Sequence, residues 1–257
     1  MASAQRQFAW YELMTTDIDA AKSFYSNIIG WGTQAPPSTG IDYTLFTTAE
    51  APVAGMMTLP DSVKAMGVPP CWTGYIGVDD VDATVAAVKR LGGHVRVEPM
   101  DIPSVGRFAV VADPQGAVFA LLAWLKPGSN GHPEAGSPGR VGWHELLAVD
   151  WEKAFGFYSE LFGWEKGESH DIGAMGTYQL FTVNGQPIGG MFNKPPMVPV
   201  PFWLYYVNVK GVDAAAERVK AGGGQIVNGP MEVPGGSWIV QCFDPQHAMF
   251  ALVGTRN

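Results

Sequence analysis

Two carboxylates occupy matching aromatic surroundings in this chain. Glu12 stands two residues after Trp10, and Glu145 stands two residues after Trp143. In a strand, residues two apart share a face, so each Glu is expected beside its Trp. A carboxylate among aromatic side chains is poorly solvated, which raises its pKa and suits it to act as a general base toward a carbon acid or water. We therefore predict Glu12 and Glu145 as the catalytic residues.

The same carboxylates also allow a structural interpretation. A strand carboxylate bonded to a cross-strand Arg or to a Tyr hydroxyl would simply stabilise the fold. Recurrence does not separate the two interpretations, because duplication preserves structural residues as readily as functional ones. Turnover and its pH dependence after replacement of each Glu by Gln would separate them.

Aromatic and Met side chains, with one Thr and one Arg, are the candidate ligand-binding residues. Such a lining would stack planar or hydrophobic ligands, although it is also typical of ordinary core. Arg107 is the candidate anion-binding group, with an exposed salt bridge as the alternative, because a guanidinium can bind a carboxylate or phosphate through two hydrogen bonds. It aligns with Trp238, so the two copies are not expected to be equivalent. The candidates are Trp10, Met14, Tyr43, Met56, Thr73, Tyr75, Arg107, Trp143, Tyr178, Met191, Tyr206 and Trp238.

The two carboxylates belong to one motif that occurs twice without a gap. The segment from Trp10 to Trp31 returns from Trp143 to Trp164, so the chain is a tandem duplication. Residues 126–140 are rich in Gly, Pro and Ser and almost lack large apolar side chains, which is typical of a linker. The predicted domains are therefore residues 1–125 and 141–257. The repeated positions include Asp17, Ala21, Phe24, Tyr25 and Gly30, and their partners Asp150, Ala154, Phe157, Tyr158 and Gly163.

Each half contains a fainter inner repeat of the order β-α-β-β-β. Asp17 is expected to begin a helix and Gly30 to end it, because Asp caps helix N-termini and Gly favours the left-handed C-terminal position. In the first half, strands are expected at 10–14, 43–48, 53–59, 72–78, 94–97, 107–112 and 117–122, with helices after residues 17 and 80. In the second half, a strand and helix are expected at 143–162, strands at 178–183, 188–192, 203–209, 225–228, 238–243 and 248–253, and a helix at 212–219.

One Asp-Pro segment precedes the last strand of each half. The two segments begin at Asp113 and Asp244 and are predicted to be turns, not catalytic acids, since Asp bonds its own backbone and Pro presets the bend. The Gly run at 222–224 is expected to close a helix, and a phosphate site would instead need a helix that opens there.

Composition limits the partners and the location. With 257 residues and a formal net charge of −8, the chain is a poor partner for nucleic acid or an anionic membrane. A small molecule is the expected partner, with monomer or homodimer left open. No signal peptide and no segment long enough to span a bilayer is recognised, so we expect a cytoplasmic protein. Cys71 and Cys242 have no pairing pattern and are expected to be reduced packing residues.

Several motifs together resemble the vicinal oxygen chelate superfamily. They are the D-x-x-x-A-x-x-F-Y-x-x-x-x-G-W segment at 17–31, V-D-D-V-D-A at 78–83 and the D-P-x-G turn. This superfamily includes glyoxalase I, bleomycin-resistance and fosfomycin-resistance proteins and extradiol dioxygenases. The segment 102–108 makes the chain similar to fused two-module glyoxalase-like proteins of actinobacteria, including "putative hydroxylase" proteins and a mycobacterial culture-filtrate antigen. The resemblance implies an α+β fold of two tandem modules, each a pair of βαβββ units forming a curved, cup-shaped sheet with helices outside.

Metal-dependent members of that superfamily carry four ligands on the cup, and the residues at those places here do not suit a divalent metal. A slip of one residue would bring in His144, Glu145 or Tyr75, but would also turn that side chain to the opposite face. The other histidines lack a partner at a metal-binding spacing, apart from Asp171 beside His170 in an expected loop. No cofactor is therefore predicted, with a divalent metal as the less favoured alternative. The ligand places hold Trp10, Met56, Thr73 and Ala120 in the first half, and Trp143, Met191, Leu204 and Ala251 in the second; the remaining histidines are His94, His132 and His247.

Two functions of different classes follow. The first is a metal-independent, glyoxalase-like enzyme, of lyase, isomerase or hydrolase type, that transforms a small carbonyl or aromatic compound with Glu12 or Glu145 as base. The second is a non-catalytic protein of the bleomycin-resistance type that binds such a compound in the same cup. A metal-dependent lactoylglutathione-lyase-type or dioxygenase enzyme is the third and weakest interpretation.

Overall fold

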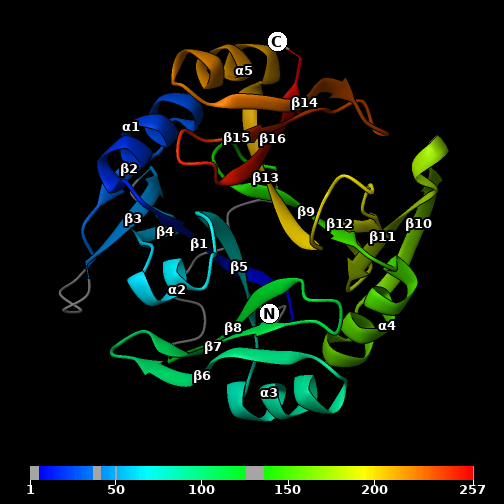
Figure 1. The fold of residues 1–257 in the computed structure, drawn as a ribbon. Coiled ribbons are helices and arrows are strands. Elements are labelled where there is room, and N and C mark those ends of the chain that lie inside the picture. The colour runs from blue at the N-terminus through cyan, green and yellow to red at the C-terminus, as the bar shows by residue number, and fades with distance from the viewer. Residues whose placement is uncertain (1–5, 37–41, 50, 126–135, 257) are drawn as a thin grey trace. The chain divides into compact units, whose positions relative to one another are not determined.

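The computed structural model describes residues 6–36, 42–49, 51–125 and 136–256 (Figure 1). Most of the predicted linker, with His132, lies outside these residues. The first half contains β1 (Phe8–Thr15), α1 (Ile18–Ile29), β2 (Gly32–Gln34), β3 (Tyr43–Thr48), β4 (Ala51–Thr58), α2 (Asp61–Ala65), β5 (Cys71–Gly77), α3 (Val81–Arg90), β6 (His94–Ile102), β7 (Gly106–Ala112) and β8 (Val118–Trp124). The second contains β9 (Val141–Ala148), α4 (Trp151–Phe162), β10 (Glu165–Asp171), η1 (Gly173–Met175), β11 (Thr177–Val183), β12 (Gln186–Asn193), β13 (Phe202–Gly211), α5 (Val212–Ala221), β14 (Gln225–Glu232), β15 (Trp238–Phe243) and β16 (Met249–Thr255).

These strands form two eight-stranded mixed sheets with the same order. The first sheet runs β2-β3-β4-β1-β5-β8-β7-β6, and the second runs β10-β11-β12-β9-β13-β16-β15-β14. Each sheet consists of two groups of four neighbouring strands, and each group is one βαβββ motif. Within a group, the first strand of the motif is parallel to its last strand, as for β1 with β4 and β13 with β16. The other pairings within the groups are antiparallel. The predicted α+β fold with repeated βαβββ motifs and curved, open sheets is confirmed.

Four elements of the fold were not predicted: β2, β10, α2 and the short helix η1. β2 and β10 each supply the strand that directly follows the first helix of a module, and α2 precedes β5. β2 has only three residues, all exposed, and β10 alternates too little for a pattern of buried side chains to emerge. His170 and Asp171, expected in a loop, therefore lie in β10.

By contacts, the chain divides into two compact units that cut across the two sequence halves. Unit 1 contains the described residues of 1–9, 73–129 and 143–204, which include the second and third βαβββ motifs. Unit 2 contains those of 10–72, 130–142 and 205–257, which include the first and fourth motifs. The repeat in the sequence says which segments are alike, but not which of them pack together.

In unit 2 the core lies between helices α1 and α5 and the strands of the same unit. Asp17 accepts a hydrogen bond from the backbone N–H of Ala20 at 3.0 Å, and Gly30 ends the helix with φ 87°, as predicted. Phe24 of α1 packs against the end of α5, where a Cβ on Gly224 would come within 2.9 Å of its ring. The Gly run at 222–224 therefore closes α5 and admits an aromatic side chain.

A pair of repeated aromatic clusters fills the two cores. In unit 1, the rings of Trp164 and Phe181 stack with centroids 4.4 Å apart, and Tyr158 stacks on Trp164 at 5.4 Å. In unit 2, Trp31 contacts Phe46 at 4.9 Å. Aromatic pairs of this kind stabilise the fold by more than the burial of their surface area alone would. The clusters explain why the F-Y and G-W pairs of the repeated motif belong together.

The Asp-Pro segments form the predicted turns and complete these cores. The Asp113 carboxylate accepts the backbone N–H groups of Gln115 and Ala117, both at 2.9 Å, and the Tyr158 hydroxyl at 3.3 Å. In unit 2, Asp244 accepts the hydroxyl of Tyr25 at 2.9 Å. Burial raises the pKa of both aspartates, partly offset by these hydrogen bonds. Each Asp thus joins a turn of one sequence half to a helix of the other.

No helix among the described residues is both long and apolar enough to cross a membrane. Cys242 is fully buried in the unit 2 core, and burial raises the pKa of its thiol to about 12. This placement agrees with the expected packing role.

Candidate functional site

In unit 2, hydrogen bonds connect the side chains of Trp10, Tyr43 and Glu12. The indole Nε1 of Trp10 donates to the hydroxyl of Tyr43 at 3.1 Å. That hydroxyl donates to Oε2 of Glu12 at 2.9 Å. Trp10 and Glu12 come from β1, and Tyr43 is the first residue of β3. The strand alternation that was predicted for Trp10 and Glu12 therefore brings them together with Tyr43.

Unit 1 contains the same chain. The indole Nε1 of Trp143 donates to the hydroxyl of Tyr178 at 2.8 Å, and this hydroxyl donates to Oε2 of Glu145 at 3.0 Å. Trp143 and Glu145 lie on β9 and Tyr178 on β11. We call each of these sets an indole–phenol–carboxylate chain. Four of the predicted ligand-binding residues and both predicted catalytic residues belong to the two chains.

A glycine on the intervening strand makes room for each tyrosine. Gly55 of β4 pairs with Glu12, and Gly190 of β12 pairs with Glu145. A Cβ on Gly55 would overlap the ring of Tyr43, and a Cβ on Gly190 would overlap the ring of Tyr178. The tyrosine crosses over the glycine to reach the carboxylate one strand further on. Prediction from the sequence missed these two glycines, although both occupy the same place in the repeat.

The electrostatics keep each phenol protonated. Burial, and next the negative charge of Glu12, raise the pKa of Tyr43 far above its ordinary value. Burial and Glu145 raise the pKa of Tyr178 in the same way. Each tyrosine is therefore the protonated partner that donates to its carboxylate. The result is a carboxylate fixed in orientation by a neutral phenol, beside an indole ring.

Met56 and Met191 lie on the face of their strands opposite to the carboxylates. Met56 pairs with Leu13, and Met191 pairs with Leu146, whereas the carboxylates pair with the preceding glycines. Met56 and Met191 are fully buried, and Met56 is part of the unit 2 core. The expectation that they face the same way as the carboxylates was wrong by one residue of strand phase. Met57 and Phe192 occupy the carboxylate faces instead.

Met14 lies on the face of Glu12, two residues further along β1, and pairs with Met57. Three other predicted residues are buried on their strands. Thr73 and Tyr75 lie on β5 with 8% and 5% exposure, and the Tyr75 ring contacts Phe108. Tyr206 of β13 is 2% exposed and accepts a hydrogen bond from Gln241 at 2.7 Å.

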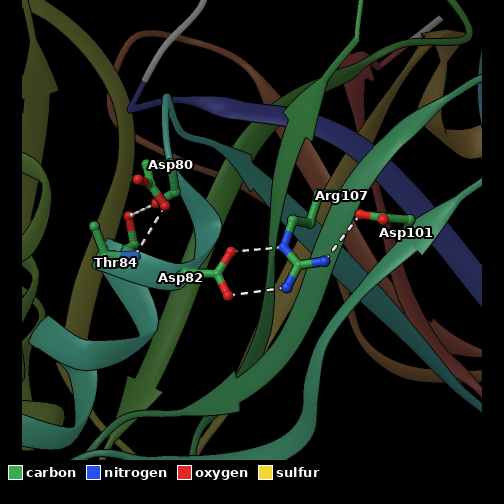
Figure 2. A network of polar contacts seen from close by, with 6 residues as sticks. Asp80, Asp82, Thr84, Asp101 and Arg107 are labelled. Carbon is green, nitrogen blue, oxygen red and sulfur yellow. Dashed lines mark hydrogen bonds and ion pairs between the residues drawn. The ribbon is translucent and has the colours of Figure 1, made fainter.

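Arg107 faces α3 and binds carboxylates of its own unit (Figure 2). Its Nε and one terminal nitrogen contact the carboxylate of Asp82 at 2.6 and 2.9 Å, and the other terminal nitrogen contacts Asp101 at 2.9 Å. Arg107 shares its side of β7 with the fully buried Ala109 and Val111. The paired guanidinium lowers the pKa of Asp82. The salt-bridge alternative is therefore the observed one, and the predicted anion site is corrected.

Trp238, which aligns with Arg107, also lies on the helix-facing side. It packs against the unit 2 core and shares its side of β15 with Val240 and Cys242. The guanidinium of Arg256 lies 4.5 Å from the centre of its ring and contacts Asp213 of α5 at 3.3 Å. An arginine that directly follows β16 thus contacts α5 in unit 2 as Arg107 contacts α3 in unit 1. The expectation that Trp238 faces the carboxylate side is corrected.

His144 lies in the core of unit 1 and not in a site. It is 7% exposed, its ring stacks on Phe8 with centroids 4.2 Å apart, and its Nδ1 lies 2.6 Å from the carbonyl oxygen of Ile188. Burial lowers its pKa to about 4. Nδ1 therefore carries the proton and donates it to this carbonyl.

The arrangement agrees with a known sequence family. The model of the Glyoxalase/Bleomycin resistance protein/Dioxygenase superfamily matches residues 7–121 and 140–252. This chain belongs to that superfamily. The two matched segments are the two halves of the duplication.

Relatives in this superfamily are similar over nearly the whole chain. "Putative glyoxylase CFP32" of Mycobacterium tuberculosis (strain CDC 1551 / Oshkosh) is 34% identical, with 95% of this chain and 93% of the relative covered. "Anthracycline biosynthesis protein DauV" of Streptomyces sp. (strain C5) is 31% identical, with 97% and 93% covered.

Solved structures share the fold of the superfamily. The Mn(II)-bound glyoxalase from Novosphingobium aromaticivorans superposes with a TM-score of 0.68 at 18% identity, covering 100% of this chain and 84% of that one. The 2,3-dioxygenase LapB from Pseudomonas sp. KL28 gives 0.67 at 12% identity, covering 96% and 91%. At these identities the likeness concerns the fold alone.

Members of the superfamily bind metal, but the side chains at the ligand places of this chain do not fit one. By the observed register, the residues of β4 on the carboxylate face are Gly55 and Met57, not Met56. Those of β12 are Gly190 and Phe192, not Met191. None of these side chains is a usual ligand of a hard or borderline cation, nor are Trp10, Thr73 and Ala120 or Trp143, Leu204 and Ala251. Within the described part of the chain, no group of three His, Cys, Asp or Glu side chains is placed to hold a metal ion.

Proposed function

We propose that this superfamily member acts on a small carbonyl or aromatic compound without a metal, with Glu12 or Glu145 as general base. One observation supports this proposal above all: a carboxylate held by a neutral phenol and an indole, present in both sequence halves. The side chains at the metal-ligand places are not usual ligands of an ion that would act as a Lewis acid. The carboxylate is therefore the group best suited to move a proton.

The hydrogen bonds favour a base of fixed orientation. The phenol uses its only proton on Oε2 of the carboxylate and accepts the indole N–H, so its own rotation is fixed. A compound that stacks beside the indole would place an O–H, N–H or acidic C–H against this carboxylate.

The proposed reaction needs no oxidant. The carboxylate takes a proton from a carbon beside a carbonyl group, and the electron pair left on that carbon delocalises onto the carbonyl oxygen. Return of the proton from the carboxyl group to that oxygen gives the enol isomer, and its return to the carbon restores the carbonyl compound. Tyr43 or Tyr178 stays protonated throughout and positions the carboxylate.

The names of the relatives support the two compound classes. A protein named a glyoxylase favours a small carbonyl compound, and one named for anthracycline biosynthesis favours an aromatic one. We further propose a cytoplasmic location, a small molecule as partner and a monomer or homodimer, in keeping with the net charge of −8.

A non-catalytic binding protein of the bleomycin-resistance type is the second candidate. The missing metal ligands support it, because the same indole and carboxylate would hold a planar donor-bearing compound without chemistry. The two candidates differ in turnover and not in binding. A metal-dependent lyase or dioxygenase has no donor set at the ligand places to support it.

A screen followed by exchange measurements tests the proposal. Thermal shift over carbonyl and aromatic compounds, including methylglyoxal, catechol and 1,4-dihydroxyanthraquinone, identifies a ligand. Mass spectrometry in D₂O then detects deuterium incorporation next to the carbonyl, or product. We expect incorporation that survives EDTA and is lost in a Glu12→Gln, Glu145→Gln double variant, but persists in the exposed control Glu232→Gln. Binding without incorporation or turnover would favour the second candidate, and activity that requires added metal would overturn both.

A further inference from the structure

The two indole–phenol–carboxylate chains are equal in their hydrogen bonds, and their indole and phenol groups are partly exposed in both units, but their carboxylates are unequally covered. The distance from the phenol oxygen to Oε2 of the carboxylate is 2.9 Å in unit 2 and 3.0 Å in unit 1. Glu12 is nevertheless partly exposed, whereas Glu145 is buried with 6% exposure. The hydrogen bonds therefore do not explain the difference in exposure between the two carboxylates, and the neighbouring side chains must be compared.

Two positions on the carboxylate face differ between the copies. Beside Glu12 they hold Met14 and Met57, which pair across β1 and β4 and are partly exposed. Beside Glu145 the corresponding residues are Leu147 and Phe192, which pair across β9 and β12. Their exposures are 5% and 6%. The carboxylate face of unit 1 is therefore closed at both positions where that of unit 2 is open.

The chemistry of these side chains explains the difference. The ring of Phe192 lies 5.7 Å from the ring of Tyr178, so the phenol of this chain has an aromatic cover. Methionine is unbranched and flexible, so Met14 and Met57 can move to admit a ligand at little cost. Leucine and phenylalanine packed in a buried layer can move only by opening a void.

We propose that only the carboxylate of Glu12 admits a ligand, and that the second indole–phenol–carboxylate chain is a duplicate whose carboxylate, Glu145, is sealed and has a structural role. Met14 and Met57 set the access of the open face, and Leu147 and Phe192 close the other. Assigning a ligand to the open face rests on the proposed function, whereas the difference in access does not.

Carboxyl labelling of the whole chain tests the access. A water-soluble carbodiimide with glycinamide modifies exposed carboxyl groups, and peptide mass spectrometry gives a rate for each residue, with exposed Glu232 as the internal reference. We expect Glu12 to react about tenfold faster than Glu145, since a buried group reacts only through local opening. Equal rates, or a faster Glu145, would overturn the proposal.

Exchanging the cover between the copies tests the cause. In the Leu147→Met, Phe192→Met variant, Glu145 should label faster while Glu12 keeps its rate. In the Met14→Leu, Met57→Phe variant, Glu12 should slow while Glu145 keeps its rate. Circular dichroism and the melting temperature identify a variant that does not fold, and the other variant then decides. Unchanged rates in a folded variant would refute the assignment of these four residues.

The labelling result and the catalytic result fail separately. If Glu12 alone is labelled but its replacement by Gln leaves deuterium exchange intact, the proposed function fails and the difference in access stands. If replacement of Glu145 alone abolishes exchange, the sealed duplicate is disproved while the proposed base chemistry survives.

Discussion

At the scale of single residues, the phenols decide how the two carboxylates are held. Tyr43 and Tyr178 each accept an indole N–H and donate to a Glu, so one hydroxyl satisfies two polar groups. Replacing either tyrosine by Phe leaves both partners without it. The cost depends on whether water can take its place.

We expect Tyr178→Phe to lower the free energy of unfolding by about 1–3 kcal/mol, because Glu145 is buried. Tyr43→Phe should cost less, since solvent reaches the partly exposed Glu12. Urea denaturation of the two variants measures the difference. A larger loss for Tyr43→Phe would contradict the unequal cover of the two copies.

Two glycine substitutions should have opposite effects. Gly55→Ala places a methyl group into the ring of Tyr43 and should destabilise the protein by about 1–3 kcal/mol through overpacking. Gly156 lies inside α4 with nothing within 4 Å of an added Cβ. Gly156→Ala should therefore stabilise by about 0.5–1 kcal/mol. Thermal unfolding of both variants checks the signs, and a neutral Gly55→Ala would mean that Tyr43 does not cross over this glycine.

His144 should make stability depend on pH. Burial lowers its pKa to about 4 in the folded protein, while the unfolded chain takes up the proton near pH 6.5. As pH falls from 6.5 to 4, the unfolded state binds the proton first, and the free energy of unfolding should drop by about 3 kcal/mol. Urea denaturation from pH 4 to 7 should show this loss in the native protein and not in His144→Gln. The exposed control His94→Gln should retain it, and a loss of the same size in His144→Gln would disprove the assignment.

At the scale of elements, the motifs of the sequence are explained by the contacts between them. The Tyr of the repeated F-Y pair binds the Asp of a D-P turn, as Tyr25 does with Asp244. The indole of Trp72 donates to the same Tyr25 hydroxyl at 2.9 Å. Helix, turn and strand thus meet at one buried hydroxyl in each unit.

Loss of that hydroxyl should be costly and coupled to the turn. Tyr158→Phe removes the donor to Asp113 and the acceptor of the Trp203 indole, and should cost about 1–3 kcal/mol. In a double-mutant cycle with Asp113→Asn, the two losses should fall short of additivity by about 0.5 kcal/mol or more. Additive losses would show that the hydroxyl and the carboxylate do not interact.

The sequence predicted the elements better than the faces they present. The helices capped by Asp17 and Asp150 and most strands follow from caps and alternation, because these signals are local. Met56 and Arg107 were placed on the wrong face, because strand phase depends on register, which one residue of error reverses. Which tyrosines bind the two carboxylates could not be predicted, because their position depends on how three strands pair. A local sequence pattern does not contain this information.

At the scale of the whole molecule, duplication produced two indole–phenol–carboxylate chains. It also produced two compact units that combine motifs from different sequence halves. The repeat could identify equivalent positions, but a packing that pairs the first motif with the fourth leaves no periodic signal. The main asymmetry of the molecule, the partly exposed Glu12 and the buried Glu145, is visible only in the structure.

The dissociation constant of the tightest-binding compound of the screen, measured by calorimetry in EDTA, shows whether Glu12 forms a metal-free binding site. We expect binding that EDTA does not change, that weakens about tenfold or more in Glu12→Gln, and that changes less than about twofold in Glu145→Gln. Binding that EDTA abolishes, or a Glu12→Gln variant that binds as tightly as the native protein, would contradict a metal-free site centred on Glu12.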